Sequence, residues 1–408
     1  MKKVRTRFAP SPTGAFHMGN VRAALFNYLF AKHTEGTFVL RIEDTDKERS
    51  KPEWEQDIVD NLKWLGLEWD EFYRQSERTE MYAKYLTQLL AQGRAYYCFC
   101  KEEDLEAQRQ DQLSRGVAPS YKGTCRTLTP KEVEKNLKEG KPCVIRLLVL
   151  AKIVSFNDIV RGQVKFDAGL MGDIVIAKDL TTPLYNFSVV VDDFEMNITH
   201  VIRGEDHISN TPKQILLQEA LGFTRPAYAH LPLILGGDRT KLSKRHGDNS
   251  VTQFRMQGYL PEAVVNFLVL LGWNPGDNRE LFTLEELVKE FSLEKVHKGG
   301  AVFNPKRLDW INGSYVRKKS LSELAELCKP YLGSAGFDVE LPLLEKVVSL
   351  YQERLKKLSE IVELADFFFK DNLSYPKDIL RWKNYTEKDA QDALEQCKTI
   401  AESVNAND

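Results

Sequence analysis

The 408-residue sequence predicts an α/β protein with a Rossmann-type parallel sheet, which is split by an inserted α+β domain and followed by an all-α C-terminal region. Three observations lead to this prediction. The N-terminal part reads strand, glycine-containing loop, helix and strand, the order of a βαβ unit. Strand and helix patterns return after a charged, cysteine-bearing stretch of roughly 100 residues. From Pro261 onward, apolar residues recur mostly at helical spacing.

The first half of the predicted sheet is formed by two short strands, Val4–Phe8 and Thr37–Ile42. A Pro/Ser/Gly loop, Ala9–His17, follows the first strand. The apolar spacing then predicts three helices in this part of the chain, over Val21–Lys32, Glu53–Leu65 and Met81–Gln92.

The second half of the sheet and the insertion are predicted from residues 142 to 235. Here one helix is expected, over Thr211–Leu221. The expected strands are Pro142–Leu150, Asp173–Lys178, Tyr185–Val191, Ile198–Arg203 and Tyr228–Leu235.

The C-terminal part is predicted to be helical throughout. Helices are expected over Pro261–Leu271, Thr283–Phe291, Lys306–Tyr315, Leu321–Tyr331 and Leu341–Phe368, and the polar tail after Pro376 is expected to form one last helix.

Composition indicates a globular protein of the reducing cytoplasm. The net charge of −2 gives no basic field over the whole chain, so a nucleic-acid partner would bind to local basic patches. Six cysteines are too few for a disulfide scaffold in a chain of this length. The N-terminus lacks the apolar core of a signal peptide, and the most apolar run, Ala263–Trp273, is about half a membrane span.

The first candidate site is the loop Ala9–Asn20 between a strand and a helix. Gly14 and Gly19 would let a ligand approach the backbone, and the helix start directs free N–H groups and positive dipole charge at it. His17 could donate to a phosphate oxygen. A loop in which His17 only packs or caps the helix is the alternative.

The second candidate site is the loop Gly236–Gly247. Lys241 and Lys244, three residues apart and flanked by glycines, could neutralise charge on a triphosphate as a phosphate bond breaks. Taken alone, the segment also fits a solvated basic turn.

Together, the two loops resemble the paired signatures of class I aminoacyl-tRNA synthetases. The segment His17–Asn20 stands in place of the first signature and Lys241–Arg245 in place of the second. Further segments resemble glutamyl-tRNA synthetases of the bacterial type, and the likeness extends from about Val4 to about Phe368. These segments are Arg7–Gly14, Ala24–Tyr28, Leu40–Asp46, Val190–Asp193 and Val201–His207.

The resemblance implies a ligase that activates glutamate with ATP and Mg²⁺ and then transfers it to the 3′ end of tRNA(Glu). It implies that His17, Lys241 and Lys244 are catalytic, and that ATP is bound by Thr13, His17, Gly19, Ser243 and Lys244. The implied glutamate-binding residues are Arg7, Ser11, Glu43, Tyr185 and Arg203. Two arginines and one carboxylate match the charges of glutamate, although which arginine holds which carboxylate stays open.

A cysteine cluster forms a candidate zinc site in the insertion. Cys98, Cys100 and Cys125, with Tyr121, could bind Zn²⁺ tetrahedrally, and zinc-binding members of the family carry a similar segment. The long zinc-binding members usually have His two residues after the third cysteine, where this chain has Thr127, whereas Tyr121 matches a shorter relative. Buried free thiols are the alternative.

The resemblance also divides the chain into five regions and implies a monomer. Residues 1–95 and 191–258 would form the two halves of the catalytic domain, and residues 96–190 the insertion that binds the acceptor end. Residues 259–320 would contact the tRNA stem, and residues 321–408 would be part of an anticodon-binding domain, in which Arg354 contacts tRNA. The family pattern makes this domain C-terminally short.

Three other functions remain open from the sequence. A shorter relative glutamylates a modified tRNA base, of the glutamyl-queuosine type, but lacks the helical region after the lysine loop. An inactive tRNA-binding paralogue would not need His17, Lys241 and Lys244. A nucleotidyltransferase would not need the set of Arg7, Glu43 and Arg203.

Overall fold

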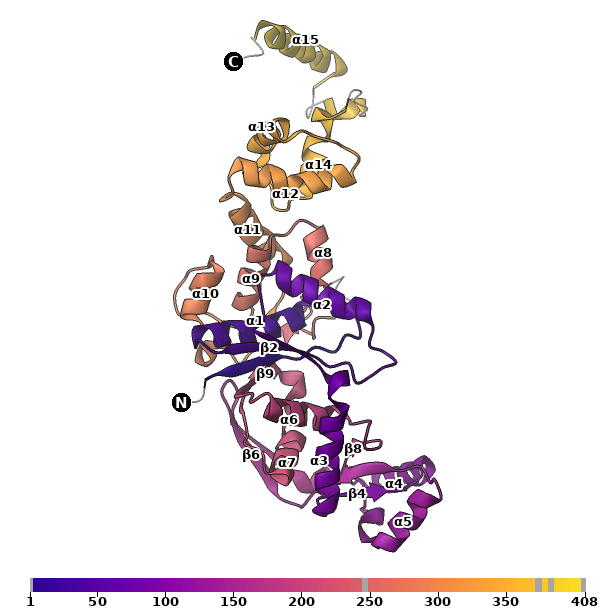
Figure 1. The fold of residues 1–408 in the computed structure, drawn as a ribbon. Coiled ribbons are helices and arrows are strands. Elements are labelled where there is room, and N and C mark those ends of the chain that lie inside the picture. Colours follow the sequence, from indigo (N-terminus) through magenta and orange to yellow (C-terminus); the bar gives the residue numbers. More distant parts are fainter. Residues whose placement is uncertain (1–2, 244–248, 371–375, 381–384, 405–408) are drawn as a thin grey trace. The chain divides into compact units, whose positions relative to one another are not determined.

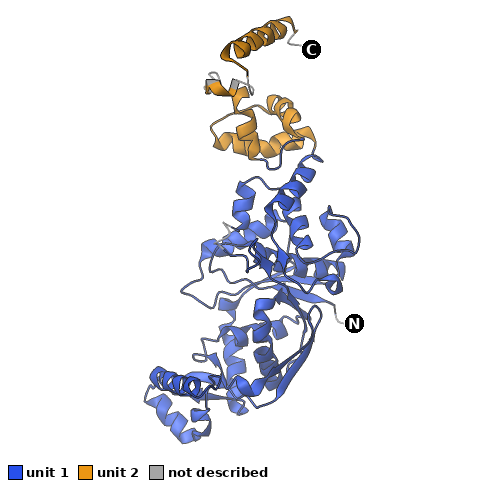
Figure 2. Ribbon diagram, turned by 180° about the vertical axis from the view of Figure 1, so that it is seen from behind, with its two compact units in different colours: residues 1–319, 353–358 blue, residues 320–352, 359–408 orange. Residues whose placement is uncertain are grey.

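The computed structural model describes residues 3–243, 249–370, 376–380 and 385–404, and the chain forms two compact units. The larger unit comprises residues 1–319 and 353–358, and the smaller unit comprises residues 320–352 and 359–408 (Figure 2).

The core of the larger unit is a mostly parallel sheet. Strands β1 (Arg5–Phe8), β2 (Thr37–Ile42) and β3 (Glu71–Arg74) pair in parallel in that order. A second group has the order β7-β6-β10-β9, in which only the β6–β7 pair is antiparallel. These strands are β6 (Ile153–Asp158), β7 (Gly162–Asp167), β9 (His200–Gly204) and β10 (Ala227–Leu231).

The two groups of strands meet at β1 and β9. The amide of Thr199 donates to the carbonyl of Arg5 over 2.9 Å, and the amide of Arg5 donates to Oγ1 of Thr199 over 2.8 Å. The chain thus leaves β1 toward β2 on one side and reaches β9 on the other, as in a doubly wound sheet. This arrangement confirms the predicted fold class.

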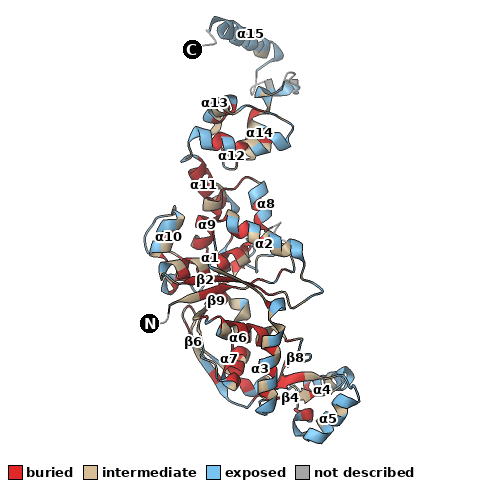
Figure 3. Cartoon of the chain, viewed as in Figure 1, coloured by how far each residue is buried: buried red, intermediate tan, exposed pale blue. Residues whose placement is uncertain are grey.

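Helices pack against the sheet, and many of their residues are buried (Figures 1 and 3). Helix α1 packs on β1, β2 and β9 and also contacts the later helices α9 and α10, so its buried residues lie on more than one side. The helices that accompany the sheet are α1 (Met18–His33), α2 (Pro52–Trp64), α3 (Thr79–Ala91), α6 (Tyr185–Glu195) and α7 (Thr211–Leu221).

The insertion contains a small antiparallel sheet of order β4-β5-β8. Its strands are β4 (Ala95–Cys98), β5 (Val144–Leu147) and β8 (Ile174–Ala177), accompanied by α4 (Glu102–Ser114) and α5 (Pro130–Lys138). By contrast, β6 and β7 extend the central sheet, although they lie between β5 and β8 in the sequence.

The rest of the described chain is mainly helical. The larger unit adds α8 (Val251–Met256), α9 (Pro261–Leu270), α10 (Leu284–Glu290) and α11 (Pro305–Val316), with a two-residue pairing of β11 (Ile234–Leu235) and β12 (Ala301–Val302). The smaller unit contains α12 (Leu321–Ser334), α13 (Leu341–Tyr351), α14 (Glu360–Ala365) and α15 (Glu387–Ser403).

Two sequence predictions are wrong. Tyr185–Val191, predicted as a strand, begins helix α6. Its three consecutive valines favour a strand, but β-branched residues cost little in a helix when they are buried, and all three are buried here. The helix predicted over Leu341–Phe368 is interrupted after Tyr351 by a turn and resumes as α14.

No helix of the described residues is both long enough and apolar enough to cross a membrane.

Candidate functional site

A cavity of about 600 Å³ opens at the carboxyl ends of β1 and β9. This is where the connections from the two strands diverge, and ligands of open α/β sheets bind at such a point. The cavity is lined by all the predicted ATP- and glutamate-binding residues that the structure describes, namely Arg7, Ser11, Thr13, His17, Gly19, Glu43, Tyr185, Arg203 and Ser243, and by Lys241. Lys244 lies outside the described residues.

One wall of the cavity is the start of helix α1. His17 is the N-cap residue, with extended backbone (φ −109°, ψ 161°), and its side chain is exposed. A Cβ atom at position 19 would lie 3.3 Å from two atoms of the His17 imidazole, so glycine allows this ring to lie against the first turn. The helix start, the glycine and the imidazole therefore form one surface suited to an anion.

The two signature loops are joined by backbone pairing. The amide of Met18 donates to the carbonyl of Asn249 over 3.1 Å, and the amide of Val251 donates to the carbonyl of Phe16 over 2.9 Å. The first loop thus pairs with the segment that directly follows the second. Lys241 reaches the same cavity and donates to Oδ2 of Asp206 over 2.7 Å.

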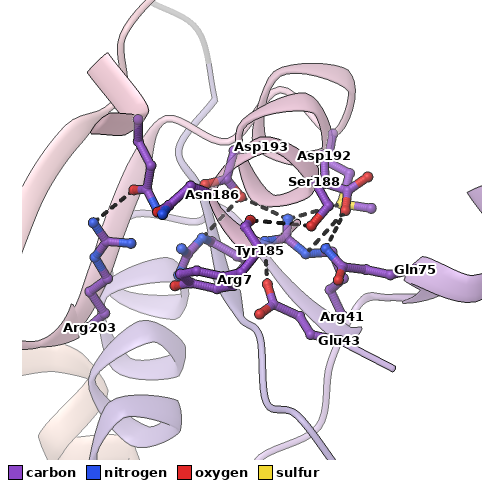
Figure 4. A network of polar contacts seen from close by, with 12 residues as sticks. Arg7, Arg41, Glu43, Gln75, Tyr185, Asn186, Ser188, Asp192, Asp193 and Arg203 are labelled. Atoms are coloured by element: carbon purple, nitrogen blue, oxygen red, sulfur yellow. Dashed lines mark hydrogen bonds and ion pairs between the residues drawn. The ribbon is translucent and has the colours of Figure 1, made fainter. Parts of the chain in front are cut away.

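A buried charge network lies behind Arg7 and Glu43, which line the cavity (Figure 4). Arg41 has no exposed surface and donates to Oδ1 of Asp193 over 2.7 Å and to Oε1 of Glu43 over 3.1 Å. Arg7 Nε donates to the same Asp193 oxygen over 3.1 Å. Burial would raise the pKa of Asp193, but the charges of Arg7 and Arg41 outweigh it and hold this pKa below its usual range.

The network extends to Asp192, which lies deeper. It accepts hydrogen bonds from Arg78 Nε (2.7 Å), Gln75 Nε2 (2.7 Å) and the Tyr82 hydroxyl (2.9 Å). These contacts fix helix α6 to α3 and to the turn before it, and α6 begins at Tyr185 in the cavity wall.

The charge of Glu43 is only partly compensated by its ion pair with Arg41. Burial raises its pKa, although Arg41 and Arg7 oppose the shift. A cation placed in the cavity would therefore stabilise its charged form.

Two further residues of the cavity wall, Tyr185 and His207, lie close together, with 3.1 Å between the tyrosine hydroxyl and Nδ1 of the histidine. Burial and the charge of Arg203 lower the pKa of His207 to about 4, so its ring is neutral at neutral pH.

Arg203 is held differently from Arg7 and Arg41. Its Nη2 donates to Thr211 Oγ1 and Gln214 Oε1, each over 2.8 Å, and its Nε faces His230 Nε2 at 3.2 Å. Within the described part of the chain, no carboxylate pairs with Arg203, and its buried Nη1 has no hydrogen-bond partner. Its positive charge therefore remains available to an anion in the cavity.

The predicted metal ligands also come together, in a second place. The Sγ atoms of Cys98, Cys100 and Cys125 lie within 4.8 Å of one another. The Tyr121 hydroxyl is 3.4 Å from the Cys98 sulfur and 3.3 Å from the Cys100 sulfur. Sulfur atoms around a tetrahedral zinc ion are separated by about 3.8 Å, so the donor set fits Zn²⁺ without a change of fold.

Arg354 is exposed on a turn between well-anchored neighbours in the larger unit. Leu355 and Leu358 are buried beside it, and the amide of Leu358 donates to the carbonyl of Gly258 over 3.0 Å. The sequence placed this arginine within a helix, whereas α13 ends three residues earlier, at Tyr351.

The residues that support the site were not singled out from the sequence. Arg41, Asp192 and Asp193 lie within segments that carry the family resemblance, but an isolated charged residue in an apolar run gives no sign of its partner. Asp158 and His230 have no such motif and were missed entirely.

Comparison with known proteins gives a consistent result. Residues 3–310 match the family model described as tRNA synthetases class I (E and Q), catalytic domain, and residues 323–408 match an anticodon binding domain. The glutamate–tRNA ligase of Aquifex aeolicus is 51% identical over 398 residues, which are 97% of this chain and 84% of that protein. The ligase of Carboxydothermus hydrogenoformans is 50% identical over 391 residues, covering 92% of this chain and 82% of that protein.

A solved structure shows the same architecture. The glutamate tRNA ligase of Elizabethkingia meningosepticum, crystallised in complex with its amino acid, superposes with a TM-score of 0.87 at 37% identity. The match covers 99% of this chain and 87% of that chain.

The charge network predicts a pH-dependent loss of stability in Asp193→Asn. Removing the negative charge leaves Arg7 and Arg41 with only a neutral amide oxygen as their shared acceptor, which should cost about 3–5 kcal/mol of unfolding free energy at pH 7. Because the folded-state pKa of Asp193 is depressed, this stability is present above the unfolded pKa of about 3.9 and is lost as pH falls through the folded pKa. Urea unfolding should show that the difference in unfolding free energy between wild type and Asp193→Asn is smaller below pH ~4 than at pH 7. Asp46→Asn, at an exposed ion pair with Arg49, is the control and should change little at either pH.

Proposed function

This chain belongs to the glutamate–tRNA ligases of the class I tRNA synthetase family, and on that premise we propose that its cavity forms glutamyl-adenylate from ATP and L-glutamate for transfer to tRNA(Glu). The observation that carries the proposal is that both signature loops and the set of Arg7, Glu43 and Arg203 line one cavity.

ATP would bind at the side formed by the start of α1. His17 and Gly19 would hold phosphate oxygens at the helix start, with Thr13 and Ser243 beside them. Lys241, which now pairs with Asp206, would turn with Lys244 toward the leaving pyrophosphate. Mg²⁺ would accompany the phosphates of ATP as it does in phosphoryl-transfer sites generally.

Glutamate would occupy the other side of the cavity. Glu43 would receive the α-ammonium group, since a cation relieves the cost of its buried charge. Arg203 would bind a substrate carboxylate through its unpartnered Nη1, and Arg7 would supply the second cation. Ser11 and Tyr185 complete the contact surface.

The chemistry follows in two steps, each driven by positioning and charge stabilisation. An α-carboxylate oxygen of glutamate attacks the α-phosphorus of ATP, and the bond to the β-phosphate breaks with release of pyrophosphate. A hydroxyl of the terminal tRNA ribose then attacks the glutamyl carbonyl carbon. The bond to AMP breaks, AMP leaves with the electron pair, and the hydroxyl proton is released.

The cysteine cluster would hold one structural zinc ion through Cys98, Cys100, Cys125 and Tyr121. Its role would be to fix β4 to the segment around Cys125, because the ligands come from both. Bound zinc supplies folding free energy to such small substructures.

We propose that tRNA contacts several regions of a monomeric, cytoplasmic enzyme. Residues 96–190 would bind the acceptor end, residues 259–320 the stem and residues 321–408 the anticodon. Exposed Arg354 would read a base edge or bind a phosphate. Thiol metal ligands favour a reducing compartment.

The tRNA-modifying alternative is disfavoured by one specific finding. Residues 323–408 match an anticodon binding domain, which a transferase acting on a modified base would not need.

The site of transfer provides the test of function. With ATP, Mg²⁺ and glutamate, the enzyme should attach labelled glutamate to tRNA(Glu) and release AMP and pyrophosphate in equal amounts. Prior periodate oxidation of the terminal ribose should abolish incorporation, since the accepting hydroxyls are destroyed. Incorporation that survives oxidation would place glutamate on a base. Absence of incorporation into both untreated and oxidised tRNA(Glu) would indicate an inactive binding protein.

The glycine of the first signature provides a matched test of the ATP site. Gly19→Ala places a Cβ against the His17 imidazole and should raise the KM for ATP by roughly tenfold, as expected when a phosphate-binding group is displaced. Gly14, in the same loop, was also predicted to let a ligand approach, but it does not line the cavity, and a Cβ there would meet no atom within 4 Å, so Gly14→Ala is the control. Equal ATP kinetics in both variants would show that the helix start is not the phosphate site.

Metal analysis tests the cysteine cluster. Protein purified without chelator should contain about one zinc ion per chain, and Cys98→Ser should lose it. Cys397→Ser, at an exposed thiol of α15, should retain the metal. Metal-free wild-type protein with titratable thiols at the three cysteines would support buried free thiols instead.

A further inference from the structure

Three polar side chains form a row across the central sheet beneath the cavity. Arg203, His230 and Asp158 belong to the adjacent strands β9, β10 and β6. Arg203 and His230 are directly paired in the parallel register of β9 and β10, so their side chains leave the same face of the sheet. Asp158 ends β6 on the other side of β10. All three are nearly or completely buried.

The row is anchored at its carboxylate end. Asp158 Oδ1 accepts the backbone amides of Val160 (3.0 Å) and Arg161 (2.8 Å), and Oδ2 faces His230 Nδ1 at 2.6 Å. Burial would raise the pKa of Asp158, but hydrogen bonds from His230 and from the Arg161 amide outweigh it and hold this pKa below its usual range. Asp158 is therefore a carboxylate, and the proton between the two groups belongs to His230 Nδ1.

The histidine in the middle has one allowed protonation state. Burial lowers the pKa of His230 and the neighbouring charge of Arg203 lowers it further, so the ring is neutral despite the hydrogen bond to Asp158. With its proton on Nδ1, the ring presents a lone pair at Nε2. That lone pair faces Arg203 Nε–H at 3.2 Å and the Thr211 hydroxyl at 3.0 Å. The opposite tautomer would direct an N–H at the guanidinium donor.

The guanidinium is thus held by neutral acceptors on two of its nitrogens. Nε donates to His230, and Nη2 donates to Thr211 and Gln214. Gln214 is itself fixed by Asn186 of α6, 3.1 Å away. A carboxylate in place of these acceptors would neutralise the charge, whereas this arrangement orients Arg203 and leaves the charge and Nη1 for a ligand.

We propose that Asp158 and His230 are positioning residues for the substrate glutamate: Asp158 fixes the tautomer of His230, and His230 holds Arg203 with Nη1 directed at a glutamate carboxylate. The inference rests on the proposed role of Arg203 in glutamate binding. Neither residue lines the cavity, and the proposed glutamate site thereby depends on a strand that lies within the insertion in sequence.

Asp158→Asn is the decisive variant because it preserves shape and inverts the hydrogen bond. The backbone amides of Val160 and Arg161 select the side-chain oxygen of the introduced asparagine, and the His230 amide, 3.2 Å from Oδ1, can donate to the same oxygen. The NH₂ group then faces His230 Nδ1. The imidazole must then carry its proton on Nε2, against Arg203 Nε–H. A wrong histidine tautomer of this kind is strongly damaging in enzymes. We expect the KM for glutamate to rise roughly tenfold or more, with the KM values for ATP and tRNA nearly unchanged.

A double-mutant cycle separates this role from a merely structural one. In an Arg203→Ala background, Asp158→Asn should have little further effect on glutamate kinetics, because both changes remove the same interaction. Asp173→Asn is the matched control: this carboxylate is also buried, accepts from Arg126 and the Val149 amide, and lines no part of the cavity. It should leave the KM for glutamate unchanged.

The outcomes distinguish the two proposals. If Arg203→Ala leaves glutamate kinetics unchanged, the assignment of Arg203 fails and this inference fails with it. If Arg203→Ala weakens glutamate use but Asp158→Asn does not, only the positioning role is overturned. The positioning role is also overturned if Asp158→Asn raises the KM for glutamate by the same factor in the Arg203→Ala background as in the wild type.

Two amide variants at position 230 give an independent comparison if Asp158→Asn does not fold. His230→Gln can place an oxygen where Nε2 lies, facing Arg203, whereas His230→Asn reaches only the Nδ1 position. We expect the Gln variant to retain a KM for glutamate within about threefold of wild type and the Asn variant to raise it roughly tenfold. An equal KM for glutamate in the two variants, or a higher KM in the Gln variant, would contradict the proposal.

Discussion

The site depends on a single buried arginine. Arg41 has no exposed surface and lies among Glu43, Asp192 and Asp193, three carboxylates that could not share this space without it. Its contacts tie strand β2 to helix α6, and that helix positions Tyr185 at its first turn. Charge pairing inside the protein thus supports the wall of the cavity, and the cavity also contains Arg203, a cation for which the described residues provide no paired carboxylate.

The two buried arginines, Arg41 and Arg203, differ in their partners, and this difference separates a structural role from a proposed binding role. Arg41 forms ion pairs with three carboxylates and serves the fold, whereas Arg203 is held by a histidine, a threonine and a glutamine. Neutral acceptors fix a guanidinium in direction without reducing its charge. On the side of the cavity proposed for ATP, backbone pairing of residues 16–18 with residues 249–251 brings the two signature loops together.

The sequence predicted the parts of this molecule that are encoded locally. The strands at Val4–Phe8 and Thr37–Ile42 and most helices follow from apolar periodicity, and the cavity residues follow from linear motifs. Tyr185–Val191 was mispredicted because its valines favour a strand, whereas long-range burial makes it a helix. Asp158 and His230 are 72 positions apart in strands without a recognisable motif, and Asp158 is one of several polar residues in its strand, so nothing local indicates that they meet. The order of strands in the sheet could not be predicted either, because it also depends on pairing between segments that are distant in the sequence.

The join between β1 and β9 also bears on how the chain is made. The first strand can pair with β2 early in synthesis, but its other edge waits for Thr199, 194 residues later. At about 5–20 residues per second, a ribosome needs roughly 10–40 s to supply that partner. Until then, the nascent chain carries an unpaired strand edge. This edge includes three residues that are buried in the folded protein, Thr6, Arg7 and Phe8. The cavity at the carboxyl ends of β1 and β9 is therefore completed late in folding, after the second half of the sheet has left the ribosome.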